Sequence, residues 1–98
     1  MIHRIVTMTF RKDEIDAFIE VFDSSKVHLR NFPGCLGLTL LQTTNKPYQI
    51  STLSLWENEE ALDAYRNSEL FLDTWAKTKV LFAEKAVAFS NHAIRTLD

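Results

Sequence analysis

Residues 2–10 read Ile-His-Arg-Ile-Val-Thr-Met-Thr-Phe, and this stretch decides which fold the chain is expected to adopt. Alternate residues form two sets, with Ile2, Arg4, Val6, Met8 and Phe10 on one side and His3, Ile5, Thr7 and Thr9 on the other. A period of two with β-branched residues predicts a strand in a sheet whose two faces differ.

The next segment predicts a helix that Asp13 caps and that runs to about Leu29. Its apolar positions follow the i, i+3, i+4, i+7 rule and place one stripe against a core; they are Ile15, Phe18, Ile19 and Phe22. Residues 31–34, Asn-Phe-Pro-Gly, end this helix. Proline cannot continue a helix, and glycine frees the backbone for the turn.

Two strands follow, over residues 35–42 and 48–56, and the polar residues 43–47 between them predict a hairpin. In the first of these strands, alternation sets Leu36, Leu38 and Leu40 against Cys35, Gly37, Thr39 and Leu41. In the second, it sets Leu53 and Leu55 against Ile50, Thr52, Ser54 and Trp56.

A second helical region begins after Asn58, which is expected to cap it, and two glutamates follow at the positive end of the helix dipole. Residues 67–68 interrupt the region, and Ser68 caps a second piece from Glu69 to about Phe82. One face of that piece carries Phe71, Trp75, Thr78 and Phe82. Residues 86–95 alternate again and predict a fourth strand.

The order strand–helix–strand–strand–helix–strand predicts an α+β, ferredoxin-like βαββαβ fold, in one domain over residues 1–98. Right-handed crossovers give a four-stranded antiparallel sheet with both helices on one face. The other face still carries apolar side chains, so we expect a homodimer whose paired sheets enclose a pocket lined by Thr, Ser, His and Trp. The sequence leaves open which face lines that pocket.

Composition narrows the classes of partner. The net charge is −2, and the 11 basic residues are scattered among 13 acidic ones, which argues against a nucleic-acid partner. No run approaches the roughly 20 apolar residues that cross a bilayer, and the N-terminus lacks a signal-peptide pattern. Cys35 is the only cysteine, so no intramolecular disulfide forms. We therefore expect a cytoplasmic protein without a membrane partner.

Three segments in the same order resemble the antibiotic biosynthesis monooxygenase family: residues 32–37 (FPGCLG), 56–62 (WENEEAL) and 68–71 (SELF). The resemblance covers nearly the whole chain. It implies a dimeric α/β barrel that oxidises a quinol or a related phenolic polyketide with O₂. It also implies that neither a metal nor a flavin is needed, so that no cofactor is expected and the partner is a small aromatic substrate.

The chain departs from this family at four positions. Many quinol-oxidising members carry Glu where this chain has Ser54, and often His where it has Tyr65 and Leu70. Haem-degrading relatives carry a helix histidine near the position of Trp75. Two alternatives therefore stay open beside the monooxygenase: a non-enzymatic module that binds a small ligand, and, third, a haem-binding or haem-degrading relative.

The candidate catalytic residues are His3 and His92, which lie on predicted strands; histidine is the side chain that most often serves as a general base, so we expect that either could deprotonate a phenol. The candidate substrate-binding residues come from the matched segments and the predicted strands and helices; they are Trp56, Trp75, Tyr65, Thr52, Ser54 and Arg4. Each has a structural alternative, such as a core tryptophan, an interface histidine or a solvated arginine. No histidine pair has metal-ligand spacing, so no metal site is predicted.

Overall fold

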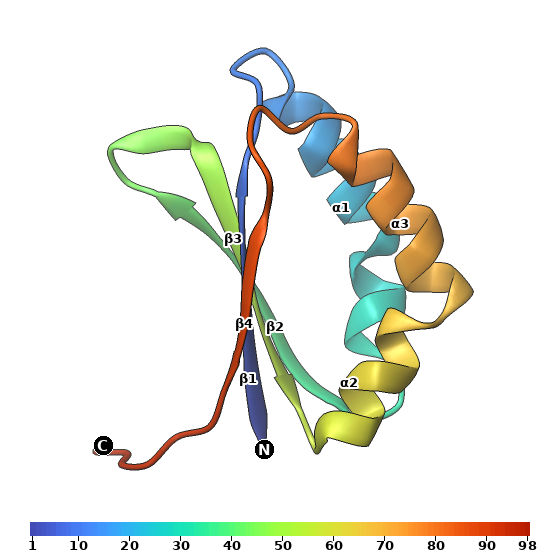
Figure 1. Cartoon of the computed structure of the whole chain (residues 1–98), viewed down its shortest axis with the longest axis vertical. Coiled ribbons are helices and arrows are strands. Elements are labelled where there is room, and N and C mark those ends of the chain that lie inside the picture. Colours follow the sequence, from blue (N-terminus) through green and yellow to red (C-terminus); the bar gives the residue numbers. More distant parts are fainter.

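The computed structural model describes residues 1–98 and confirms the ferredoxin-like α+β fold (Figure 1). In chain order its elements are β1 (Ile2–Thr9), α1 (Ile15–Arg30), β2 (Cys35–Thr43), β3 (Lys46–Trp56), α2 (Glu59–Arg66), α3 (Glu69–Lys79) and β4 (Val87–Asn91).

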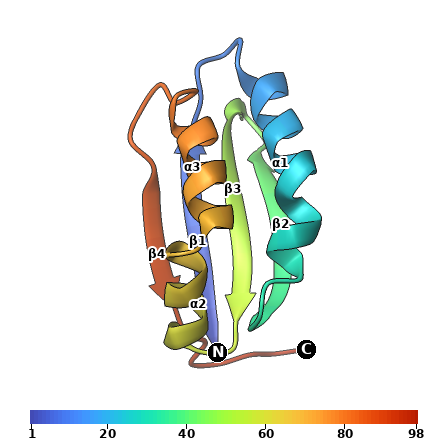
Figure 2. The same ribbon diagram turned by 90° about the vertical axis from the view of Figure 1, so that its right-hand side faces the viewer.

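The four strands form one antiparallel sheet in the order β2-β3-β1-β4. All three helices cover the same face of this sheet, with α1 over the β2 side and α2 and α3 over the β1–β4 side (Figure 2). Strand β1 is central, and Arg4 lies between Ser54 of β3 and Ser90 of β4 in the register. Val6 and Met8 lie on the same side of β1 as Arg4, and this side faces the helices.

Both predicted helix caps in the second helical region are confirmed. Asn58 accepts a hydrogen bond through its side chain from the backbone N–H of Ala61 at 2.9 Å. The hydroxyl of Ser68 accepts one from the N–H of Phe71 at 3.1 Å. These side chains satisfy amide groups that have no partner within the helix. The break at residues 67–68 turns α3 relative to α2 (Figure 1).

The ends of several elements differ from the prediction. Helix α1 starts after Glu14, not Asp13, and α3 ends at Lys79, before Phe82. Strand β3 begins at Lys46, so the hairpin turn is shorter than residues 43–47. Phe82 instead forms an isolated bridge with Phe10, which ties the end of the helical layer to the sheet.

Strand β4 ends at Asn91, short of the predicted 95, because its partner strand ends. Asn91 lies opposite His3, so β1 has almost no residues left beyond that point with which β4 could pair. The predicted strand residue His92 consequently lies in the exposed C-terminal segment.

The face assignment of β2 was wrong at its start. A register shift between Cys35 and Gly37 adds one residue, which turns Cys35 to the helix side together with Leu38 and Leu40. Leu36 points outward and is 40% exposed, whereas Cys35 is buried. A β-bulge of this kind leaves no periodic trace in the sequence.

Two core clusters lie between the sheet and the helices. One contains the buried residues Met8, Phe10, Phe18 and Ile50, and the other contains Cys35, Trp56 and Leu62. The rings of Phe10 and Phe18 have centroids 4.5 Å apart in the first cluster. Between these two clusters the packing is incomplete, and this is where the cavity described below lies.

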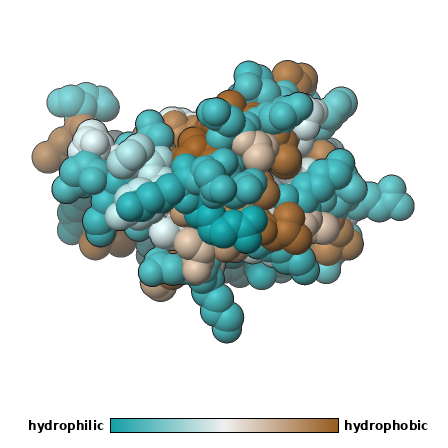
Figure 3. Space-filling model, turned by 90° about the horizontal axis from the view of Figure 1, so that it is seen from above, coloured by the Kyte–Doolittle hydropathy of each residue, from teal (hydrophilic) through white to brown (hydrophobic).

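The face of the sheet away from the helices, here called the open face, carries exposed apolar side chains. Ile5 of β1 has Leu53 of β3 and Phe89 of β4 as its neighbours in the register. Phe89 is 63% exposed and Val87 is 51% exposed. The end of the molecule seen in Figure 3 is mostly polar, with apolar side chains between the polar ones. None of the helices has the length and apolar character that crossing a membrane requires.

Candidate functional site

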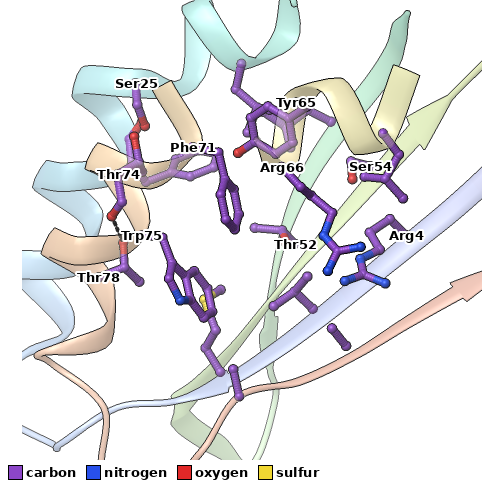
Figure 4. Close-up of a pocket in the computed structure, with 18 of the residues that line it drawn as sticks. Arg4, Ser25, Thr52, Ser54, Tyr65, Arg66, Phe71, Thr74, Trp75 and Thr78 are labelled. Atoms are coloured by element: carbon purple, nitrogen blue, oxygen red, sulfur yellow. Dashed lines mark hydrogen bonds between the residues drawn. The ribbon is translucent and has the colours of Figure 1, made fainter. Parts of the chain in front are cut away.

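A cavity of about 530 Å³ lies between the sheet and its helices within one chain (Figure 4). The pocket predicted from the sequence was placed between two paired sheets, whereas this cavity lies within a single chain. Small side chains create the space: Ala86 and Ala88 lie beneath the helices at the β4 side, and Ser25 faces the cavity from α1. The volume is in the range of sites for small organic molecules.

Aromatic rings form the helix-side wall of the cavity. Phe71 and Trp75 of α3 stack at 5.7 Å between centroids, with an angle of 12° between their planes. Tyr65 of α2 meets Phe71 edge-on at 5.2 Å. Figure 4 shows the three side chains on the helix side, across the cavity from the strands. This wall suits a flat apolar ligand, because offset and edge-to-face contacts between rings are favourable.

Trp56 does not line the cavity. It is fully buried, and its indole N–H donates to the hydroxyl of Ser54 at 2.9 Å. Tyr65 stacks on its ring at 5.0 Å between centroids. The predicted contact between Trp56 and a ligand is therefore not available in this cavity. The residue instead holds Tyr65 and Ser54 in place.

Thr52 and Ser54 of β3 supply the polar part of the sheet-side wall. Both point toward the helices, as the parity of β3 requires when Trp56 is buried beneath them. The hydroxyl of Ser54 accepts the bond from Trp56, which leaves its own hydrogen free to donate. Thr52 makes no side-chain hydrogen bond to the protein, so its hydroxyl is available to a ligand.

The hydroxyl of Tyr65 has no hydrogen-bond partner in the protein. No buried polar side-chain atom in the structure lacks a partner, so this hydroxyl is accessible, and Tyr65 lines the cavity. Burial, and secondarily the nearby Cys35, raises the pKa of Tyr65 to about 12. Its phenol thus remains protonated at neutral pH and acts as a hydrogen-bond donor toward the cavity.

Two arginines meet at one end of the cavity. Arg4 of β1 donates to the hydroxyl of Ser90 at 3.0 Å. Arg66, in the last turn of α2, lies 3.8 Å from the carboxylate of Asp63. Figure 4 shows the two guanidinium groups next to each other. Burial, followed by the positive charge of Arg66, lowers the pKa of Arg4 from its usual value.

The candidate catalytic histidines do not reach the cavity. His3 points to the opposite side of β1 from Arg4 and lies with Ile5 on the open face, where Leu55 and Asn91 are its neighbours in the register. His92 lies beyond β4 and is exposed. Neither is placed to deprotonate a ligand in this cavity. The structure also contains no group of three or more His, Cys, Asp or Glu side chains able to hold a metal ion.

Sequence reasoning missed Arg66, Asp63 and the cavity-facing role of Phe71, which was assigned only to a helix face. The sequence does contain a sign that Arg66 faces inward. It follows the apolar Leu62 by four residues, so the two side chains lie on the same side of α2. Arg66 is the last residue of α2, and its side chain lines the cavity. Of the six predicted substrate-binding residues, all except Trp56 line the cavity; they are Arg4, Thr52, Ser54, Tyr65 and Trp75.

The sequence matches the model of a protein family described as antibiotic biosynthesis monooxygenase over residues 1–77. The matched range includes the three segments on which the resemblance was based. No curated protein matches the sequence.

Several solved structures share this fold. A crystal structure of an antibiotic biosynthesis monooxygenase superimposes with a TM-score of 0.91 at 18% identity, covering 97% of this chain and all of that one. Rv0793 from Mycobacterium tuberculosis gives 0.89 at 18% identity, with 99% and 98% covered. A mutant of SnoaB, a cofactor-independent oxygenase from Streptomyces nogalater, gives 0.86 at 19% identity, with 98% and 95% covered. At these identities the likeness establishes the fold.

Proposed function

The chain belongs to the antibiotic biosynthesis monooxygenase family, and on this premise we propose that it is a cofactor-independent monooxygenase acting on a small phenolic aromatic. The observation that carries the proposal is the cavity, in which an aromatic wall faces hydroxyl donors and a cationic end. The same arrangement of a flat apolar slot with a few polar groups is typical of sites that orient aromatic ligands.

The reaction needs only the substrate and O₂. A phenolate with a free para carbon transfers one electron to O₂, and the resulting radical and superoxide combine to form a C–O bond. The hydroperoxide then loses water, so one oxygen atom becomes the new quinone carbonyl and the other leaves in water. The proton of the phenol and the hydrogen of the para carbon supply the two hydrogens of that water molecule.

The protein accelerates this reaction by favouring the phenolate. The protonated hydroxyl of Tyr65 and the hydroxyl of Thr52 are donors for the phenolate oxygen, and hydrogen bonds to a charged group are the stronger kind. Arg4 and Arg66 add a positive potential that lowers the cost of the anion in a low-dielectric space. Asp63 is the only carboxylate that lines the cavity, and it is our candidate acceptor for the phenol proton.

The proposed active form is a homodimer that pairs two open faces. Five apolar residues support this, and they lie on three neighbouring strands: Ile5, Leu53, Leu55, Val87 and Phe89. An exposed apolar surface on a sheet is a cost in water that a second copy removes. The interface lies on the side of the sheet away from the cavity, so each chain keeps its own site.

Oxygen consumption by chelator-treated protein tests the activity directly. The substrates are a panel of naphthols and anthrols with a free para carbon, each corrected for autoxidation without protein. We expect uptake well above the background for at least one substrate. A panel that shows no enzyme-dependent uptake, while its members bind in the cavity, would reject the proposal.

A non-enzymatic binding module is the second candidate, and one observation favours it: the cavity contains no histidine, and its only carboxylate is exposed and paired with Arg66. Binding without chemistry raises the melting temperature as ligand is added, by mass action. If the ligand is recovered unchanged after aerobic incubation, this second function is supported; an oxidised product excludes it.

A further inference from the structure

Arg4 and Arg66 form a charge cluster that lacks a full counterion. The charged side chains that line the cavity are these two arginines and Asp63, which leaves one positive charge in excess. The contact between Arg66 and Asp63 is long, at 3.8 Å, and the Asp63 side chain is 67% exposed. Arg4 donates only to a neutral hydroxyl, that of Ser90.

The fold holds the two guanidinium groups together although they repel each other. Arg4 is fixed on the central strand between Ser54 and Ser90, and Arg66 on the side of α2 that carries the buried Leu62. Figure 4 shows both groups directed to the same end of the cavity. Like charges that lie next to each other repel, and an anion placed between them would replace this repulsion with attraction.

The geometry favours a carboxylate over a single phenolate oxygen at this position. Each guanidinium presents several N–H donors in a planar fork, so two of them together suit an anion with two acceptor oxygens. A carboxylate supplies two oxygens and one negative charge, which equals the excess charge of the cluster. Its aromatic ring would then extend between Trp75 and Phe71 on one side and Thr52 on the other.

We propose that Arg4 and Arg66 form a carboxylate clamp at the open end of the cavity, and that the substrate is therefore a hydroxylated aromatic acid. The proposal rests on the use of the cavity as the substrate site and specifies the class of molecule that enters it. The clamp orients the ring, while the phenol is held by the hydroxyl donors farther along the cavity.

Anaerobic calorimetric titration separates this proposal from the question of catalysis. The probes are naphthalene-2-carboxylate and naphthalene-2-carboxamide, which have the same shape and differ in charge. Hydrogen bonds to a charged group contribute about 1.5–3 kcal/mol, so we expect the acid to bind about 10- to 100-fold more tightly than the amide. Arg4→Gln and Arg66→Gln should each remove most of this preference while leaving amide binding within about twofold, since the wall contacts remain.

Two variants serve as controls. Arg11→Gln removes an exposed arginine that pairs with Glu14 outside the cavity, and it should keep the full preference for the acid. Asp63→Asn removes the competing carboxylate and should tighten binding of the acid but not of the amide. Circular dichroism verifies that each variant is folded.

The outcomes are distinct. If wild-type protein binds acid and amide equally, or if the folded Arg4→Gln/Arg66→Gln double variant keeps its preference for the acid, the clamp is rejected and the proposed monooxygenase stands. If neither probe binds at millimolar concentration, the cavity does not hold an aromatic acid and the clamp is rejected, while O₂ uptake with the phenol panel decides separately whether the proposed monooxygenase stands. Binding of the acid with the expected pattern, but without O₂ uptake by any hydroxylated acid, supports the clamp and rejects the oxidation.

Discussion

Tyr65 connects the packed core with the cavity. One face of its ring stacks on the buried Trp56, and its edge meets Phe71 of the cavity wall. Its hydroxyl is accessible and has no partner in the protein. The ring is thus held by packing, whereas the hydroxyl is available for chemistry, so the two contributions are separable by substitution.

Replacing Tyr65 with Phe tests the proposed donor. The ring contacts persist, so the fold should be retained, whereas one hydrogen bond to the phenolate is lost. We expect turnover to fall about 10- to 100-fold, from the value of about 1.5–3 kcal/mol for a hydrogen bond to a charged group. Tyr48→Phe is the matched control, because Tyr48 lies outside the cavity. Equal turnover by wild type and Tyr65→Phe would remove Tyr65 from the mechanism.

The raised pKa of Tyr65 predicts a late ionisation. The folded protein retains the phenol proton up to about pH 12, whereas the unfolded chain loses it at about pH 10. The neutral phenol thus contributes stability below about pH 10, and this contribution is lost as the pH rises toward 12. In an ultraviolet titration, the difference between wild type and Tyr65→Phe should have its midpoint near pH 12. A midpoint near pH 10 would show that the phenol is not shielded.

At the level of residues, the sequence predicted five of the cavity-lining side chains but misplaced the histidines. Both sides of β1 carry apolar residues, so alternation alone did not show whether Arg4 or His3 faces the helices. The helices determine the inner face by covering Met8 and Phe10. Trp56 was misjudged for a related reason, since a tryptophan on the inner face packs equally well in a core or against a ligand.

At the scale of the elements, the turn before β2 has a specific role: it joins α1 to the strand that pairs with β3 at Trp56. Gly34 has φ = +87° and is the only residue with a positive φ. A Cβ atom at this position would collide with the Cβ of Ala61 in α2. The glycine thus permits both the turn and the close approach of α2, which carries Tyr65 and Arg66.

Gly34→Ala should destabilise the protein by about 1–3 kcal/mol, the usual cost of a residue held in an unfavourable backbone region, with the collision adding to it. Urea unfolding measures the change. Gly37→Ala is the matched control, because its added Cβ would lie 3.7 Å from that of Leu55, an ordinary contact. Similar stability losses in the two variants would contradict the special role of Gly34.

The order and type of the elements followed from periodicity, turns and caps, but their exact ends did not. The bulge between Cys35 and Gly37 adds a residue without changing the local composition, so the predicted faces were exchanged at the start of β2. The length of β4 depends on where β1 ends, which is a property of the sheet and not of residues 86–95. The ends of the strands and the faces of their side chains were therefore determined by how the strands pair in the sheet, which the local sequence pattern does not show.

At the scale of the whole molecule, the two faces of the sheet have different proposed roles. The helix side encloses the cavity, and the open face carries the exposed apolar residues. The sequence correctly predicted a half-covered sheet, yet it placed the pocket on the uncovered side. The cavity depends on the sizes of side chains from all seven helices and strands, among them the small Ala88 of β4 and the large Trp75 of α3, and strand order alone does not reveal this complementarity.

The proposed homodimer is tested by placing a charge on the open face. Phe89→Glu should convert the dimer to a monomer, because it would bury a carboxylate against apolar residues of the second copy. Leu72→Glu changes a comparably exposed apolar residue on α3 and should leave the dimer intact. Light scattering after gel filtration gives the mass of each. A wild-type monomer, or a dimer that tolerates Phe89→Glu, would contradict the assigned interface.

Mass spectrometry of the product formed under ¹⁸O₂ by metal-depleted protein tests the proposed oxygen insertion directly, with a hydroxylated naphthoate or an anthrol as substrate. We expect a quinone that contains one ¹⁸O atom, formed by the wild type faster than by Tyr65→Phe. A product without the label, or equal label in the presence and absence of protein, would show that the cavity does not catalyse oxygen insertion.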